Sequence, residues 1–220
     1  MTDDGEGLPL ADRLARRIRA LLITGDLAPG QRLSETAFSE RFDVSRNSLR
    51  EAFRLLTKDG LLRHEANRGV FVVVPTMASI IDIYRVRRML ECGALRQAWH
   101  QHPALKAMRA AVDLGQRLRE EGDWAGVASA NMTFHTTVID LADSARLSEF
   151  YERISAELRL CFGLLNDPEH LHSPFVDMND TVATLVEANR PLEAAAQMET
   201  YLNLAERTML KALERACEQG

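Results

Sequence analysis

The sequence predicts a mainly α-helical protein that combines an N-terminal winged helix-turn-helix with a C-terminal all-helical bundle. Two short helical stretches joined by a tight turn precede a pair of β-prone runs, and only helical periodicity follows Pro75. Residues 10–75 carry 12 Lys and Arg against 8 Asp and Glu, whereas residues 76–220 carry 15 against 21. We therefore expect a basic domain over residues 1–75 and an acidic helical domain over residues 76–220.

The first two helices of the N-terminal domain are expected over Leu10–Thr24 and from Ser34 to Phe42. Apolar residues recur at helical spacing in the first stretch, and Gly25 suits a left-handed cap at its end. The sequence Pro29-Gly30 then favours a tight turn. Ser34 is a suitable N-cap for the short second helix.

A third helix and a β-hairpin complete this domain. Ser45 can cap a helix that runs from Arg46 to about Lys58. The β-prone runs 61–64 and 70–74 enclose the polar turn Asn67-Arg68-Gly69, which is a hairpin signal.

The C-terminal domain is expected to contain six helices separated by polar or proline-containing breaks. The break after the fourth of them is predicted as a loop over Asn166–Pro174. Trp99 and Trp124 are interpreted as core or dimer-surface residues. The six expected helices are Ala78–Gln101, Ala104–Glu121, Trp124–Leu141, Ala145–Leu165, Val176–Ala188 and Pro191–Cys217.

Composition narrows the class of protein. The N-terminus is acidic and lacks a signal-peptide core, and no stretch approaches a membrane span, so we expect a cytoplasmic protein without a membrane partner. The cysteines are odd in number and widely separated, which favours free thiols over disulfides. The sequence shows no catalytic triad, phosphate-binding glycine loop or paired carboxylates, so no catalytic residues and no enzyme are predicted. The cysteines are Cys92, Cys161 and Cys217.

The third helix carries the candidate DNA-binding residues. A recognition helix reads bases in the major groove with its N-terminal residues, and arginine and asparagine are suited to guanine and adenine. Serines and main-chain amides at a helix start can hold phosphate. These roles fall on Ser45, Arg46, Asn47, Ser48 and Arg50. Further phosphate or minor-groove contacts are expected from Arg32, Arg41 and Arg68.

The alternative is that Arg46, Arg50 and Arg54 form an ordinary solvated face. The turn, the hairpin and the local positive charge favour the DNA-binding interpretation. Arg54 lies one turn further along, where pairing with a glutamate is at least as well supported.

The first 75 residues resemble the DNA-binding domain of GntR-type bacterial regulators. The shared elements are "GDLAPGQRLSE", "VSRNSLREAFRLLTKDGLL" and "NRGVFV", in that order. The family usually has Thr-Pro-Val where this chain has Asn47-Ser48-Leu49. The resemblance implies a winged helix-turn-helix that binds double-stranded DNA.

The rest of the chain resembles the helical FCD effector domain of the FadR-like subfamily, through "VRRMLECGALRQA", "NMTFHTTVIDLA" and "DTVATLVEANRPLEAAAQMETYL". The resemblance implies a divalent metal held by one Asp and three His. Those four positions fall here on Asn131, His135, Asn179 and Tyr201. With only His135 retained, no metal and no other cofactor are predicted. Asp180 is the alternative to Asn179, and His170 and His172 are expected in a loop.

The same positions form the candidate effector site. We expect Asn131, His135, Asn179, Tyr201 and Arg87 to bind a small polar ligand such as an organic acid. The alternatives are a buried core role for His135 and simple ion pairing of Arg87 with Glu91. The sequence thus predicts a ligand-responsive transcriptional repressor that binds its operator as a homodimer. An architectural DNA-binding protein and an enzyme in the helical domain are the competing classes.

Overall fold

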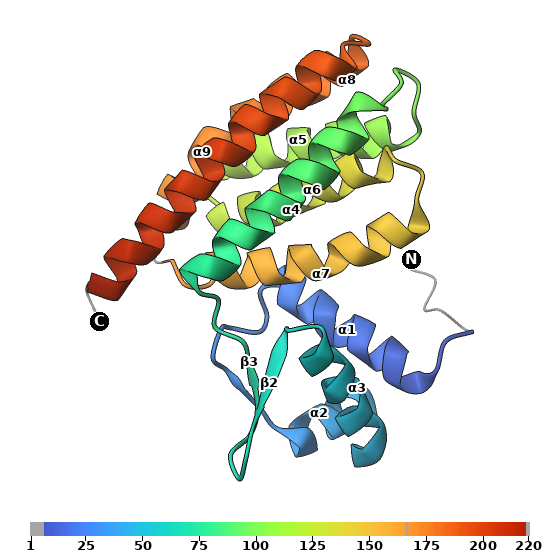
Figure 1. The fold of residues 1–220 in the computed structure, drawn as a ribbon, viewed down its shortest axis with the longest axis vertical. Helices are drawn as coiled ribbons and strands as arrows, with labels where there is room; N and C mark the ends of the chain where they lie inside the picture. Colours follow the sequence, from blue (N-terminus) through green and yellow to red (C-terminus); the bar gives the residue numbers. More distant parts are fainter. Residues whose placement is uncertain (1–6, 166, 219–220) are drawn as a thin grey trace.

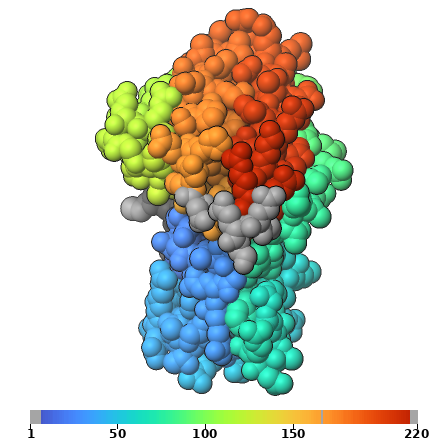
Figure 2. Space-filling view, turned by 90° about the vertical axis from the view of Figure 1, so that its left-hand side faces the viewer, coloured from blue at the N-terminus to red at the C-terminus, as the bar shows by residue number. Residues whose placement is uncertain are grey.

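The structure is a computed structural model that describes residues 7–165 and 167–218, with the backbone alone for 216–218. It has two lobes, a narrower one formed by the N-terminal part of the chain and a wider helical one (Figure 2). The described residues form nine helices and one three-stranded sheet. The predicted fold class, a winged helix-turn-helix followed by a helical bundle, is confirmed.

The narrower lobe, here called the head (residues 10–72), contains three helices and the sheet. Its strands are antiparallel in the order β1-β3-β2. The hairpin and the pair α2 and α3 lie at the end of the head that points away from the second lobe (Figure 1). The elements are α1 (Leu10–Thr24), β1 (Arg32–Leu33), α2 (Glu35–Phe42), α3 (Arg46–Lys58), β2 (Leu62–Glu65) and β3 (Gly69–Val72).

The caps that the sequence predicts set the ends of these helices. Gly25 adopts φ +86°, a left-handed conformation that favours glycine, and it ends α1. The hydroxyl of Ser34 accepts a hydrogen bond from the amide of Ala37 at 3.3 Å, and that of Ser45 accepts one from the amide of Ser48 at 3.1 Å. Each bond satisfies a helix-start amide that lacks an intrahelical partner.

The core of the head is formed mainly by its own helices and strands. Ile18 and Leu22 from α1 and Leu49 and Leu56 from α3 are completely buried. Hydrophobic burial of this extent is the main force that holds three short helices together.

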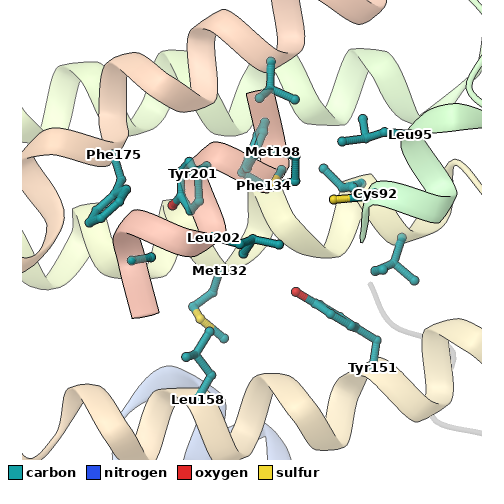
Figure 3. Packing of buried hydrophobic residues seen from close by; sticks show 14 of the residues in the cluster. Cys92, Leu95, Met132, Phe134, Tyr151, Leu158, Phe175, Met198, Tyr201 and Leu202 are labelled. Atoms are coloured by element: carbon teal, nitrogen blue, oxygen red, sulfur yellow. The ribbon is translucent and has the colours of Figure 1, made fainter. Parts of the chain in front are cut away.

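The wider lobe, here called the body (residues 77–218), is a bundle in which α6 packs against α4, α5, α7 and α8. Thr76 begins it with a capping box to Ser79. Figure 3 shows part of its core, with Phe134, Met198 and Leu202 packed between helices. The helices are α4 (Met77–Arg96), α5 (Ala104–Glu121), α6 (Trp124–Asp140), α7 (Ala145–Phe162), α8 (Pro168–Glu187) and α9 (Pro191–Glu218).

The body differs from the sequence prediction at several points. The loop expected over Asn166–Pro174 is wrong from Pro168 onward, because α8 starts there, capped by the Asp167 carboxylate on the amide of His170 at 2.9 Å. The helix expected to reach Gln101 ends at Arg96, and the helix expected to reach Leu165 ends at Phe162. A core position for Trp99 is wrong, since the residue is 46% exposed, and the alternative of a dimer surface stays a prediction.

Two further sequence predictions concern thiols and membranes. Cys92 and Cys161 are free and buried, as expected, whereas the side chain of Cys217 lies outside the described residues. In the described ranges, no helix combines the length and apolar character needed to cross a bilayer.

Candidate functional site

The first turn of α3 is an exposed polar surface. Ser45, Arg46, Asn47 and Arg50 are all exposed, and Ser48 is half-buried. The opposite face of the same helix packs into the head core, so burial fixes which face is free. The buried residues are Leu49, Ala52, Phe53 and Leu56.

Contacts with α2 hold the two arginines of this turn near their positions. Arg50 Nε donates to Glu35 Oε2 at 2.9 Å, and Arg46 Nη2 donates to Thr36 Oγ1 at 3.3 Å. The Arg50 side chain is still 59% exposed, so solvent screens this pair and a stronger anion can compete for it. The two helices therefore present fixed but accessible guanidinium groups.

The other predicted DNA-contacting residues flank this turn. Arg68, at the hairpin, has a 71% exposed side chain and pairs with Glu65 at 2.5 Å. Arg41 lies 5.9 Å from the ring centre of Phe42, and Arg32 is exposed on β1. These are surface cations on the head.

Arg54 pairs with a glutamate, which is the alternative that the sequence analysis left open for it. Its side chain is 80% exposed and lies 3.5 Å from Glu51 one turn earlier on the same helix. It thus belongs to a solvated intrahelical pair.

A second cluster is buried in the body around Glu91. This carboxylate is fully buried and accepts three hydrogen bonds. Arg87 Nε donates to Oε1 at 2.7 Å, and the Tyr151 hydroxyl donates to the same oxygen at 2.6 Å. The Nδ1 atom of His135 lies 2.6 Å from Oε2. In Figure 3 the Tyr151 ring extends from α7 toward the other helices of the bundle.

The cluster continues through His135 to two asparagines. The Tyr201 hydroxyl lies 3.0 Å from His135 Nε2 and 2.9 Å from Asn131 Oδ1. Asn179 Nδ2 donates to the same Asn131 oxygen at 2.7 Å. Asp180, the alternative position, instead pairs with Arg109 at the surface. The structure thus brings all five predicted effector-site residues into one buried hydrogen-bond network.

The charges of the network follow from its contacts. Burial raises the pKa of Glu91, but the Arg87 charge and the hydrogen bonds from His135 and Tyr151 outweigh burial and hold that pKa at about 2. Burial lowers the pKa of His135 more than the Glu91 carboxylate raises it. Near neutral pH the network therefore contains one cation, one anion and a neutral imidazole that donates from Nδ1 to Glu91.

Two small cavities of about 10 Å³ adjoin the network, and both are lined by Asn131 and His172. Arg87 and Tyr201 line one cavity, and Asn179 lines the other. Arg87 Nη2 and Asn179 Oδ1 are buried and make no hydrogen bond within the described part of the chain. The cluster thus has an unused donor and an unused acceptor.

Sequence reasoning missed two members of this site. Tyr151 donates to Glu91 from α7, and no sequence spacing relates it to the other helices. His172 was expected in an exposed loop, but it is 3% exposed on α8. Only His170 of that pair is exposed.

Two protein-family models match the chain. Residues 10–72 match the bacterial regulatory proteins of the gntR family, and residues 82–204 match the FCD domain. The chain belongs to the GntR family, with an FCD domain. A solved structure of a transcriptional regulator GntR from Rhodococcus sp. RHA1 is 36% identical, covers 92% of this chain and 98% of that one, and has a TM-score of 0.83.

Curated GntR-type relatives match over shorter stretches. The HTH-type transcriptional regulator YdhC of Bacillus subtilis is 26% identical over 148 residues, 66% of either chain. The HTH-type transcriptional repressor RspR of Escherichia coli K12 is 36% identical over 90 residues, 41% of this chain and 40% of its own. The chain thus spans less than two thirds of the length of these relatives.

The residues present do not fit the divalent metal that the FCD resemblance implies. His135 is the single imidazole at the four positions, and its Nε2 already faces the Tyr201 hydroxyl. The Asn131 oxygen already accepts from Asn179 Nδ2 and lies 2.9 Å from the Tyr201 hydroxyl, and neutral amide and phenol oxygens bind transition metals weakly. In the parts of the chain that the structure describes, no group of three or more His, Cys, Asp or Glu could hold a metal ion.

Proposed function

We propose that this GntR-family protein is a transcriptional regulator that binds duplex DNA through the head and senses a small organic acid in the body. The observation that carries the proposal is the exposed first turn of α3, which presents Arg46, Asn47 and Arg50 on a helix whose other face is buried.

In this proposal α3 enters the major groove, which is wide enough for one helix. Arg46, Asn47 and Arg50 face base edges, while Ser45 and Ser48 approach phosphate at the helix start. Arg68, at the hairpin, reaches the minor groove or the backbone. Arg32 and Arg41 are further phosphate contacts.

We propose a homodimer, because two heads related by a two-fold axis read two half-sites and together bind more tightly than one. Repression is the proposed outcome of DNA binding. It is supported by the name of one relative, the transcriptional repressor RspR. We also propose that the chain divides near Pro75 into a DNA-binding domain (residues 1–75) and a helical domain (residues 76–220).

The proposed effector site is the polar network next to the two cavities. Arg87 Nη2 suits a carboxylate, and Asn179 Oδ1 suits a hydroxyl or ammonium donor on the same molecule. A cavity of about 10 Å³ holds roughly one water molecule, so an acid can enter only if the side chains around it move. Effector binding is therefore expected to change the structure of the body.

The test is fluorescence anisotropy with labelled DNA from upstream of the gene, with unlabelled competitor DNA and a salt titration. We expect competitor-resistant binding that weakens as salt rises. Binding that competitor DNA abolishes at every salt concentration would contradict the proposal. A thermal-shift screen of organic acids, with and without divalent metals and chelator, tests the body, and we expect a shift with an acid that chelator leaves unchanged.

A further inference from the structure

Helix α7 belongs to both hydrophobic cores of the protein. Ala156 and Leu160 are 0% and 2% exposed and pack within the core of the head. Leu158 and Cys161, both 1% exposed, pack within the core of the body. Figure 1 shows α7 between the head and the rest of the bundle. Because protein cores are close-packed, a displacement of α7 must change the packing of both lobes.

On the head side, α7 holds the end of α1 through Arg159. Arg159 Nη2 donates to the carbonyl of Thr24 at 3.2 Å. The guanidinium lies directly against Gly25, where an added Cβ would be 2.8 Å from Nη2. Gly25 thus both ends α1 and leaves room for the arginine.

Two further contacts join α7 to the head. Pro29 packs so closely on Gly163, just beyond α7, that a Cβ at Gly163 would lie 2.8 Å from Pro29 Cδ. Arg153 Nη2 donates to the carbonyl of Asp59, at the end of α3, at 3.4 Å. Helix α7 therefore contacts the segment after α1 and the segment after α3.

On the body side, α7 reaches the effector site at two points. The Tyr151 hydroxyl donates to Glu91 Oε1. Near the other end of the helix, the Phe162 ring lies 4.8 Å from the His172 ring at 89°. Phe162 and His172 both line the cavity next to Arg87.

We propose that α7 carries the effector signal to the head and that Arg159 is the residue that passes it to α1. An acid that enters the cavity beside Arg87 displaces Phe162 and His172. The resulting shift of α7 moves Arg159 against Gly25 and so changes the position of α1 in the head. This inference rests on the proposed effector site and specifies how that site regulates DNA binding.

The test needs neither effector nor DNA. Ala205, on α9, lines the same cavity, and Ala205→Met inserts bulk there as a substitute for a bound acid. Amide hydrogen exchange of residues 21–31 is then measured in this variant, in Arg159→Met and in the double variant. Arg146→Met is the matched control, because Arg146 is an exposed arginine on α7 without a hydrogen bond or ion pair to the described residues.

We expect Ala205→Met to change exchange at Gly25 and Asp26 by about 5-fold or more, the lower end of ordinary allosteric coupling. Arg159→Met should remove this response, whereas Arg146→Met should preserve it. An unchanged exchange pattern in Ala205→Met, or the same response with and without Arg159, would overturn the inference. If Ala205→Met does not melt cooperatively, Ala205→Val makes a smaller insertion at the same place. Since neither DNA nor acid is used, a failure here is distinguishable from a failure of the proposed function.

Discussion

Replacement of Glu91 by glutamine should strongly destabilise the body. Glu91 is fully buried and is the counter-ion of Arg87, whose side chain is 2% exposed. Glutamine has nearly the same shape but no charge, and its single carbonyl oxygen cannot replace two carboxylate oxygens. The substitution therefore leaves the Arg87 cation buried without an anionic partner.

Two estimates give the magnitude of this effect. Removal of one member of a buried ion pair typically costs about 3–5 kcal/mol. The pKa of Glu91 falls from 4.5 to about 2, and at about 1.4 kcal/mol per unit this corresponds to roughly 3 kcal/mol of stability. Because the pKa is lowered on folding, this stability is present above pH 4.5 and is lost as the pH falls toward 2.

The assay is urea unfolding followed by circular dichroism at pH 7. We expect Glu91→Gln to lower the free energy of unfolding by about 3 kcal/mol, and Arg87→Met added to it to restore about 2 kcal/mol, because no unpaired charge then remains. The control Glu193→Gln removes an exposed pair with Arg190 and should leave the midpoint unchanged. A cost below about 1 kcal/mol, or additive effects of the two substitutions, would refute the reasoning.

Three other substitutions test separate parts of the structure. Burial and the charge of Arg159 lower the pKa of His172 to about 4, so the free energy of unfolding should fall by up to about 3 kcal/mol between pH 6.5 and 4. Urea midpoints should show a smaller fall in His172→Gln and the full fall in the exposed control His170→Gln. Gly25→Ala should lower the melting temperature by several degrees, since alanine is strained at φ +86° and meets Arg159. Leu56→Ala should cost about 2–5 kcal/mol in urea unfolding, because Leu56 is 0% exposed.

The helices of the head could be predicted because capping residues next to each end determine where the helix starts or stops. Ser34, Ser45 and Gly25 each form the cap that their residue type favours, and α1 and α3 begin and end at the predicted residues. Strand β1 could not be predicted, since two residues carry no periodicity. It exists because Arg32 and Leu33 pair with β3.

The start of α8 was mispredicted because proline was read as a break. Pro168 instead occupies the first turn, where its missing amide costs nothing. Pro174 lies inside the helix, whose first turns are held by the burial of Leu171 and His172. Tertiary packing thus outweighs a local signal there.

The residues of the proposed effector site could be predicted only partly. Asn131 and His135 lie one turn apart on α6, so their shared face follows from helical spacing. Asn179 and Tyr201 came from the family resemblance. Nothing in the sequence relates Tyr151 or His172 to these positions, because the packing of α7 and α8 against α6 brings them together.

The central claim is that the exposed first turn of α3 contacts DNA. The most direct measurement compares the affinity of Arg46→Ala, Arg50→Ala and Arg54→Ala for the upstream DNA fragment by anisotropy at fixed salt. If the claim holds, the first two lose about 1–3 kcal/mol of competitor-resistant binding and Arg54→Ala loses much less. If all three bind like the unmodified protein, or lose affinity equally, these arginines are only a solvated face and the claim is contradicted.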